Sequence, residues 1–98
     1  MGIRFHNMIS VPVDVYHRNM KLATIANRNS EHNSIFATNE RFGFNVGDEL
    51  SFSLHIGDKI LPYCTVKIDD DRISDIYIGK INQNFEPSMK EQVIYRFG

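Results

Sequence analysis

The sequence contains a single cysteine, Cys64, no tryptophan and only three prolines among its 98 residues. One cysteine excludes a disulfide framework and a zinc site built from several thiolates. Basic and acidic residues number 11 and 12, so the formal net charge is −1. A chain with this balance lacks the clustered cations with which proteins hold a nucleic acid polymer through its phosphates. We therefore expect no nucleic acid polymer as a partner.

Long hydrophobic runs are also absent, since no segment approaches the roughly 20 apolar residues of a membrane-spanning helix. Residues 1–6 lack the charged and then apolar layout of a secretory signal. We therefore expect a cytoplasmic protein without membrane insertion. The composition, with 42% hydrophobic and 23% charged residues, is typical of a globular chain of one domain.

Over most of the chain the hydrophobic pattern has a period of two, which is typical of half-buried strands. The clearest alternating sets are Val11, Val13 and Val15, and then Leu50, Phe52, Leu54 and Ile56. Pro12 cannot donate to a strand ladder, so its strand should begin there or lie at an edge. Gly57-Asp58 predicts a hairpin that leads to a strand with Ile60, Cys64, Val66 and Ile68 in phase. Cys64 is therefore expected to be buried rather than reactive, and Gly79 marks a bulge or a close approach.

The pattern changes near the C-terminus. Ser88 and Glu91 have the spacing of a capping box, which marks the start of a helix. Met89, Val93 and Phe97 then fall on one helical face. The sequence thus predicts a C-terminal helix at residues 86–97.

These elements together predict a mainly β fold with a short C-terminal α-helix. We expect a small six-stranded antiparallel β-barrel at residues 10–82, preceded by an N-terminal segment at residues 1–9. The chain should form a single domain over residues 1–98.

The residue types that carry most enzyme chemistry occur without a site pattern. No histidine has helical or hairpin spacing to another metal ligand; the four are His6, His17, His32 and His55. Asp69-Asp70-Asp71 lacks the alternating ligands and the glycine of a calcium loop, so we interpret it as a solvated turn. Ser30 and His32 are close in sequence, but no oxyanion site accompanies them. We therefore expect no enzyme, no metal site and no resident cofactor.

A polar loop at residues 27–34, together with Arg4, is the segment with the most binding chemistry. Arginine can clamp a phosphate or stack on a base, and Asn and Ser can recognise the edge of a purine. The same composition is typical of an ordinary connection between strands, because Asn and Ser favour turns. The spacing alone favours the ordinary connection.

Several stretches of the chain resemble a PilZ domain over roughly residues 4–97. The first strand of that family is similar to Ser10–Val15, and its later strands are similar to Ser34–Phe36, Val46–Leu50 and Tyr77–Ile81. PilZ domains are small bacterial six-stranded β-barrels with a C-terminal helix, and they are receptors for cyclic diguanylate (cyclic-di-GMP). The resemblance implies the same fold here, with cyclic-di-GMP as the ligand that such a site would take.

The ligand motifs of the family are degenerate in this sequence. The family uses Arg-x-x-x-Arg before its first strand, whereas this chain has Arg4 and then Met8, which brings no charge. Its second motif is Asp/Asn-x-Ser-x-x-Gly. One register, residues 28–33, keeps only Ser30, and its Asn33 is able to mimic the positive φ of the glycine. The other register, residues 29–34, keeps only Asn29. The resemblance gives these candidate ligand-binding residues: Arg4, Arg28, Asn29, Ser30 and Asn33.

Some PilZ proteins, including those of type IV pilus systems, lack both motifs and act through protein contacts. The resemblance therefore implies a bacterial adaptor in cyclic-di-GMP, motility or type IV pilus pathways, whose partner is another signalling, pilus or flagellar protein. The alternative is a functional cyclic-di-GMP receptor with a variant site, in which Arg28 supplies the missing positive charge.

Overall fold

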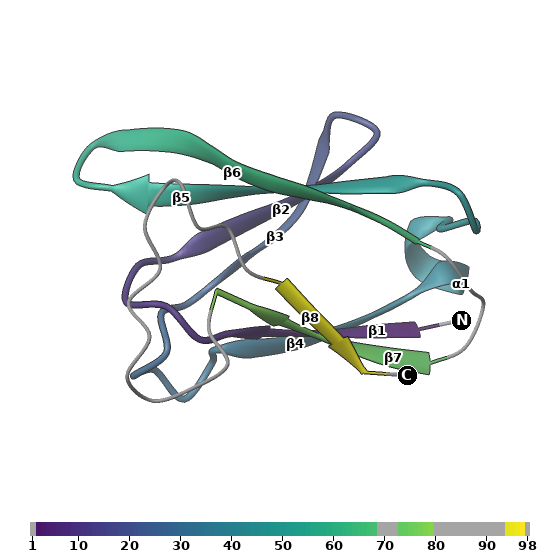
Figure 1. Ribbon diagram of the computed structural model, residues 1–98, viewed down its shortest axis with the longest axis horizontal. Coiled ribbons are helices and arrows are strands. Elements are labelled where there is room, and N and C mark those ends of the chain that lie inside the picture. Colours follow the sequence, from purple (N-terminus) through teal and green to yellow (C-terminus); the bar gives the residue numbers. More distant parts are fainter. Residues whose placement is uncertain (1, 69–72, 80–93, 98) are drawn as a thin grey trace.

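The computed structural model describes residues 2–68, 73–79 and 94–97, and these residues are mainly β-structure. The elements in chain order are β1 (Gly2–Asn7), β2 (Val13–His17), β3 (Met20–Ile25), β4 (Ser34–Thr38), α1 (Asn39–Phe42), β5 (Glu49–Ile56), β6 (Lys59–Lys67), β7 (Ile73–Ile78) and β8 (Ile94–Phe97). They lie in two layers, as Figure 1 shows.

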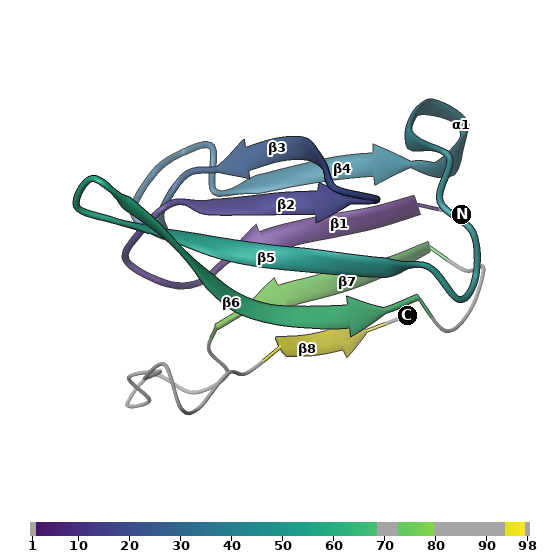
Figure 2. The same cartoon turned by 90° about the horizontal axis from the view of Figure 1, so that it is seen from above.

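Each layer is a four-stranded sheet. Sheet A has the strand order β4-β1-β7-β8, and sheet B has the order β3-β2-β5-β6 (Figure 2). Neighbouring strands are antiparallel, except that β1 runs parallel to β7, with Gly2 opposite Ile73 and Asn7 opposite Ile78. Residues 2–7, expected to precede the barrel, are instead an inner strand of sheet A.

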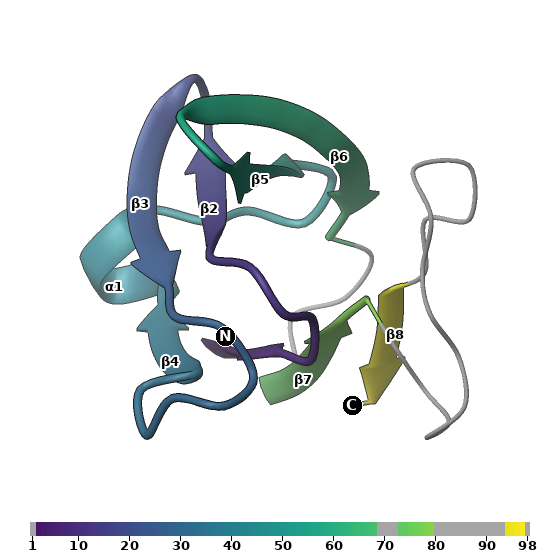
Figure 3. The same ribbon diagram turned by 90° about the vertical axis from the view of Figure 1, so that its left-hand side faces the viewer.

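The six-stranded antiparallel barrel is not confirmed. The described residues form eight strands in two sheets, and hydrogen bonds do not join these sheets into a closed ring (Figure 3). The two extra strands are β1 and β8 at the ends of the chain. Both form by pairing with the distant β7, and a local hydrophobic pattern does not report such a pairing.

The C-terminal helix predicted at residues 86–97 is wrong over its last four residues. Ile94–Phe97 pair with β7 as β8, with Ile94 opposite Ile78 and Phe97 opposite Asp75. A helix of about ten residues is marginal by itself, so strand pairing can override its pattern. Residues 86–93, with the predicted capping box, and the aspartates at 69–71 lie outside the described residues.

The core lies between the two sheets and follows the alternation in the sequence. The predicted inward residues of β2 and most of those of β5 are buried: Val13, Val15, Leu50, Phe52 and Leu54. From sheet A, Ile3 and Phe5 face them, and the ring of Phe5 meets that of Phe52 edge to face at 6.0 Å. Each such side chain contributes about 1.5–3 kcal/mol to stability when it is fully buried.

A bulge in β6 changes the predicted phase of that strand. Phe52 pairs with Cys64 and Ser53 pairs with Pro62, so Tyr63 is the extra residue. Tyr63 is consequently buried, whereas Ile60 is 54% exposed. The phase prediction is therefore wrong for Ile60, because the bulge shifts the strand by one residue. Ile56 is also exposed, since it lies next to the hairpin turn.

Two local predictions in sheet B hold, and a third, the burial of Cys64, holds in part. Residues 57–58 form the turn between β5 and β6, since Ile56 pairs with Lys59. Pro12 directly precedes β2, and its carbonyl accepts a hydrogen bond from the backbone N–H of His55 at 3.0 Å. Cys64 is half-buried, and this burial raises the pKa of its thiol to about 12. The thiol is therefore protonated at neutral pH and is a poor nucleophile.

Candidate functional site

The polar loop at residues 27–33 folds back onto the end of β1. The backbone N–H of Asn7 donates to the carbonyl of Asn33 at 2.8 Å, and that of Arg28 donates to the carbonyl of Ile9 at 2.9 Å. The two sequence windows that resemble ligand motifs, residues 4–8 and 28–33, are therefore neighbours in space. Four of the candidate residues lie on this loop: Arg28, Asn29, Ser30 and Asn33.

Three polar side chains of this loop, those of Asn27, Ser30 and Asn33, hold its own turns. Asn27 Oδ1 accepts from the N–H of Asn29 at 3.0 Å, and Ser30 Oγ accepts from the N–H of His32 at 3.1 Å. Asn33 Nδ2 contacts the carbonyls of Asn7 and Arg28 at 3.4 and 3.5 Å. Arg28 is exposed, and its guanidinium forms no ion pair within the described part of the chain.

Asn33 does not use its ability to mimic the positive φ of the family's glycine. Among the described non-glycine residues, a positive φ occurs at Arg18 and Asn19, in the turn between β2 and β3. Asn33 instead leads directly into β4 with ordinary backbone geometry. The absence of glycine at position 33 therefore imposes no conformational cost on this loop.

Asn7 fixes the loop and was not singled out from the sequence. It is fully buried, and its Nδ2 donates to the carbonyls of Val11, Ile25 and Ala26 at 2.9, 3.2 and 3.0 Å. Its Oδ1 accepts from the N–H of Ile9 at 3.0 Å. The amide thus joins β1, the segment before β2 and the end of β3. A signal for it exists in the sequence, because Asn7 continues the inward alternation of Ile3 and Phe5.

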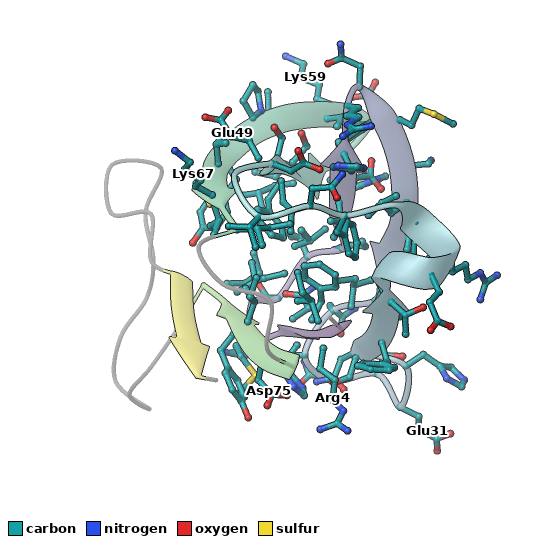
Figure 4. The ribbon with its side chains drawn as sticks, turned by 90° about the vertical axis from the view of Figure 1, so that its right-hand side faces the viewer. Arg4, Glu31, Glu49, Lys59, Lys67 and Asp75 are labelled. Atoms are coloured by element: carbon teal, nitrogen blue, oxygen red, sulfur yellow. The ribbon has the colours of Figure 1, made fainter. Side chains whose placement is uncertain are left out.

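Arg4 lies apart from the loop. Arg4 precedes Asn7 by three residues, and three residues of a strand span about 10 Å. The side chain of Arg4 is exposed on the outer face of sheet A. Its guanidinium is 3.9 Å from Asp75 Oδ1 and lies over the ring of Phe36 at 5.4 Å. Figure 4 shows Arg4 and Asp75 together at this face. The structure therefore groups four of the five candidate residues and separates the fifth.

Next to Arg4, three polar side chains form a row across sheet A. His6 Nδ1 is 2.8 Å from Ser34 Oγ, and His6 Nε2 is 2.8 Å from Asp75 Oδ1. The imidazole also stacks on the ring of Tyr77, with centroids 4.4 Å apart. A neutral His6 can accept from Ser34 while it donates to Asp75, so the row links β4, β1 and β7. The sequence did not indicate this row, because its members are far apart in the chain.

Two carboxylates, Asp14 in β2 and Asp48 just before β5, each lie close to a histidine nitrogen. Asp14 is fully buried, accepts a hydrogen bond from Thr24 Oγ1 and has His55 Nε2 within 2.8 Å of its Oδ2. The geometry of the contact with His55 falls short of a well-formed hydrogen bond. Burial opposes ionisation of Asp14, but Thr24 and His55 outweigh it and lower the pKa of the carboxyl group.

Asp48 anchors the turn before β5. Its Oδ2 lies 2.8 Å from His17 Nε2, 3.0 Å from the N–H of Asn45 and 3.4 Å from Arg18 Nη2. The hydrogen bond from His17, followed by that from Asn45, lowers the pKa of this carboxyl group below its ordinary value. An aspartate at position 48 is therefore explained by the turn that it closes.

These lowered pKa values predict a loss of stability in acid. The ionised carboxylates of Asp14 and Asp48 stabilise the folded chain, and this stabilisation is fully present above the pKa of an aspartate in the unfolded chain, about 3.9. It is lost as the pH falls through the lower pKa that each aspartate has in the folded chain. We expect the melting temperature, followed by circular dichroism, to fall between about pH 5 and pH 2. The D14N variant should be less stable near neutral pH and should show a shallower acid dependence. An unchanged acid dependence would contradict the role of Asp14.

The described residues offer little for metals or membranes. No group of three or more histidines, cysteines or carboxylates in residues 2–68, 73–79 and 94–97 is arranged to hold a metal ion. Within the same residues, no helix has the length and apolar character needed to cross a membrane.

Comparison with known proteins adds no relatives. No protein-family model, no curated protein and no solved structure matches this chain significantly.

Proposed function

We propose that this chain is a PilZ-like adaptor of bacterial signalling, motility or type IV pilus assembly that acts through contacts with a partner protein. In this proposal cyclic-di-GMP binds weakly or not at all. Support comes from the order of motif-like segments in the sequence and from the neighbourhood of residues 4–8 and 28–33 in space. The mainly β fold is compatible with the proposal, although the described sheets do not close into the barrel of that family.

The observation that carries the weak-binding proposal is that three of the five candidate ligand-binding residues already have partners within the chain. Arg4 is directed to Asp75 and Phe36, and Ser30 and Asn33 serve the loop itself. Met8 adds no charge where the family has an arginine. Each missing charge-assisted hydrogen bond costs about 1.5–3 kcal/mol. Loss of two such contacts would reduce affinity by roughly two to four orders of magnitude.

One feature supports the alternative, a cyclic-di-GMP receptor with a variant site. Arg28 is exposed at the loop and has no ion-pair partner among the described residues, so it is available to a phosphate. Arg4 is about 10 Å along β1 from the loop. A dinucleotide could contact both arginines only if Arg4 left Asp75.

Isothermal titration calorimetry with cyclic-di-GMP tests the proposal. At roughly 50 μM protein, a concentration suited to micromolar constants, we expect no saturable heat from the wild-type chain. Met8→Arg restores a cation beside the loop and should strengthen binding by about tenfold to a hundredfold. Asn33→Gly should give no gain, because residue 33 does not need a positive φ.

Two outcomes would contradict this account. A low-micromolar constant for the wild-type chain would make it a receptor, and Arg28→Ala and Arg4→Ala would then show which arginines bind. No gain from Met8→Arg, in a variant with an unchanged melting temperature, would overturn the alignment of residues 4–8 with the family motif.

A further inference from the structure

A groove lies between the β2–β3 turn and the helix α1, which sit toward the same end of the molecule (Figure 2). Its volume is about 330 Å³. Its lining includes three cations, which we call the basic rim: Arg18, Lys21 and Arg41. It also includes three apolar side chains, which we call the apolar floor: Met20, Leu22 and Phe42. The groove therefore combines a hydrophobic contact surface with positive charge.

The charge of this groove differs from that of the chain as a whole. The net charge of the sequence is −1, yet the basic rim gathers three of its 11 basic residues. No acidic residue lines the groove among the described residues, and Glu40 of α1 does not face it. Asp48 contacts Arg18 at 3.4 Å and Asp14 interacts electrostatically with Lys21, so part of this positive charge is offset within the chain. Such a site attracts a negatively charged partner.

The apolar floor is open to a partner. Met20 is 71% exposed, the largest value among the exposed hydrophobic side chains of the described chain. Phe42 is half-buried, stacks on Phe44 at 5.9 Å and carries the guanidinium of Arg41 over its ring at 5.4 Å. Aromatic and arginine side chains in this arrangement are typical of the residues that dominate binding energy at protein interfaces.

One residue of the basic rim, Arg18, has an unusual backbone conformation. Arg18 and Asn19 form the β2–β3 turn with φ values of +52° and +63°. Asn-Gly adopts such a turn most easily, and an arginine at the first position is uncommon because its Cβ is crowded. The β2–β3 turn nevertheless has an arginine at this position, and the side chain of Arg18 lines the groove.

We propose that the groove binds an acidic peptide segment of a partner protein, with one apolar side chain on the floor and carboxylates on the rim. This inference rests on the adaptor function proposed above and names the surface of the chain that contacts the partner protein. A peptide fits better than a nucleic acid, because the floor is apolar and the field is confined to one groove. An anionic membrane would also meet cations beside an exposed methionine, so the test includes it.

The test is a selection from a random 12-residue phage-displayed peptide library on the full chain. We expect enriched peptides with several carboxylates around one apolar residue, and a synthetic copy of the consensus should bind in fluorescence polarisation. The double variant K21E/R41E should weaken that binding at least tenfold. The matched control K59E/K67E makes the same change in net charge on β6, away from the groove, and should bind almost as well as wild type.

Several results would overturn the groove as an acidic-peptide site. One is a selection that yields no acidic consensus. Another is an equal loss of peptide binding in K21E/R41E and in K59E/K67E. A third is that no peptide is selected while the chain binds phosphatidylglycerol vesicles and K21E/R41E abolishes that binding. A consensus that binds independently of the groove would reject this site but retain the adaptor function. No peptide together with a low-micromolar cyclic-di-GMP constant would reject both.

Discussion

Asn7→Ala is expected to lower the free energy of unfolding by about 3–5 kcal/mol. The Asn7 amide donates to three backbone carbonyls and accepts from the N–H of Ile9 while fully buried. Alanine would leave these groups without partners, and each buried unsatisfied group costs about 1–3 kcal/mol. Since a domain is stable by only about 5–15 kcal/mol, the variant should be close to unfolding. Urea denaturation followed by circular dichroism measures the difference.

Two further substitutions make the result specific to the Asn7 amide. Asn7→Asp keeps the shape but removes the donors and points a carboxylate at three carbonyl oxygens, so at neutral pH it should destabilise at least as strongly as alanine. Asn45→Ala is the control, because Asn45 is exposed and, among the described residues, its side-chain amide contacts just the carbonyl of Gly43, at 3.4 Å. It should cost less than about 0.5 kcal/mol. A loss below about 1 kcal/mol in Asn7→Ala would contradict the role of the buried amide.

Gly79→Ala should destabilise the chain by about 3 kcal/mol or more. Gly79 has a φ of +103°, and a Cβ placed on it would lie well under 3.0 Å from Ile9 Cγ2. Ile9 is buried at 6% exposure and cannot move without disturbing the core. The predicted close approach at Gly79 is thus confirmed, and its partner is the segment that follows β1. Thermal and urea denaturation check the size of the loss.

The matched control is Gly57→Ala. Gly57 also has a positive φ, +62°, but a Cβ there would meet nothing within 4 Å. Its cost should therefore be only the conformational one, about 1–2 kcal/mol. The double variant I9A/G79A should lose less than the sum of its single changes, because Ile9→Ala removes the clashing methyl group. Additive losses, or equal costs at Gly79 and Gly57, would show that the contact with Ile9 is unimportant.

The fold was predictable where the pattern is local. The alternation in Val13–Val15 and in Leu50–Leu54, with the turn at residues 57–58, correctly predicts β2, β5 and their burial. The pairings of β1 and β8 with β7 were not predictable in this way, because strand partners distant in the sequence leave no periodic signal. The bulge at Tyr63 likewise depends on the register against β5.

The candidate site was predictable in composition but not in arrangement. The loop residues Arg28–Asn33 lie together beside the end of β1. Tertiary contacts determine the position of Arg4 and the backbone conformation of the loop residues. Arg4 is held by Asp75 and Phe36 from neighbouring strands, and the positive φ values occur at the β2–β3 turn rather than at Asn33.

The parallel pairing of β1 with β7 has a consequence for the order of folding. The strands of sheet B lie between Val13 and Lys67, and both β2 with β3 and β5 with β6 are consecutive strands that pair with each other. Sheet B can therefore form while later residues are still being synthesised. Sheet A cannot: its inner strand β1 precedes sheet B in the chain but pairs with β7, which in turn pairs with β8. Contacts of such long sequence separation form slowly. Sheet A is therefore complete only after β7 and β8 are available for pairing.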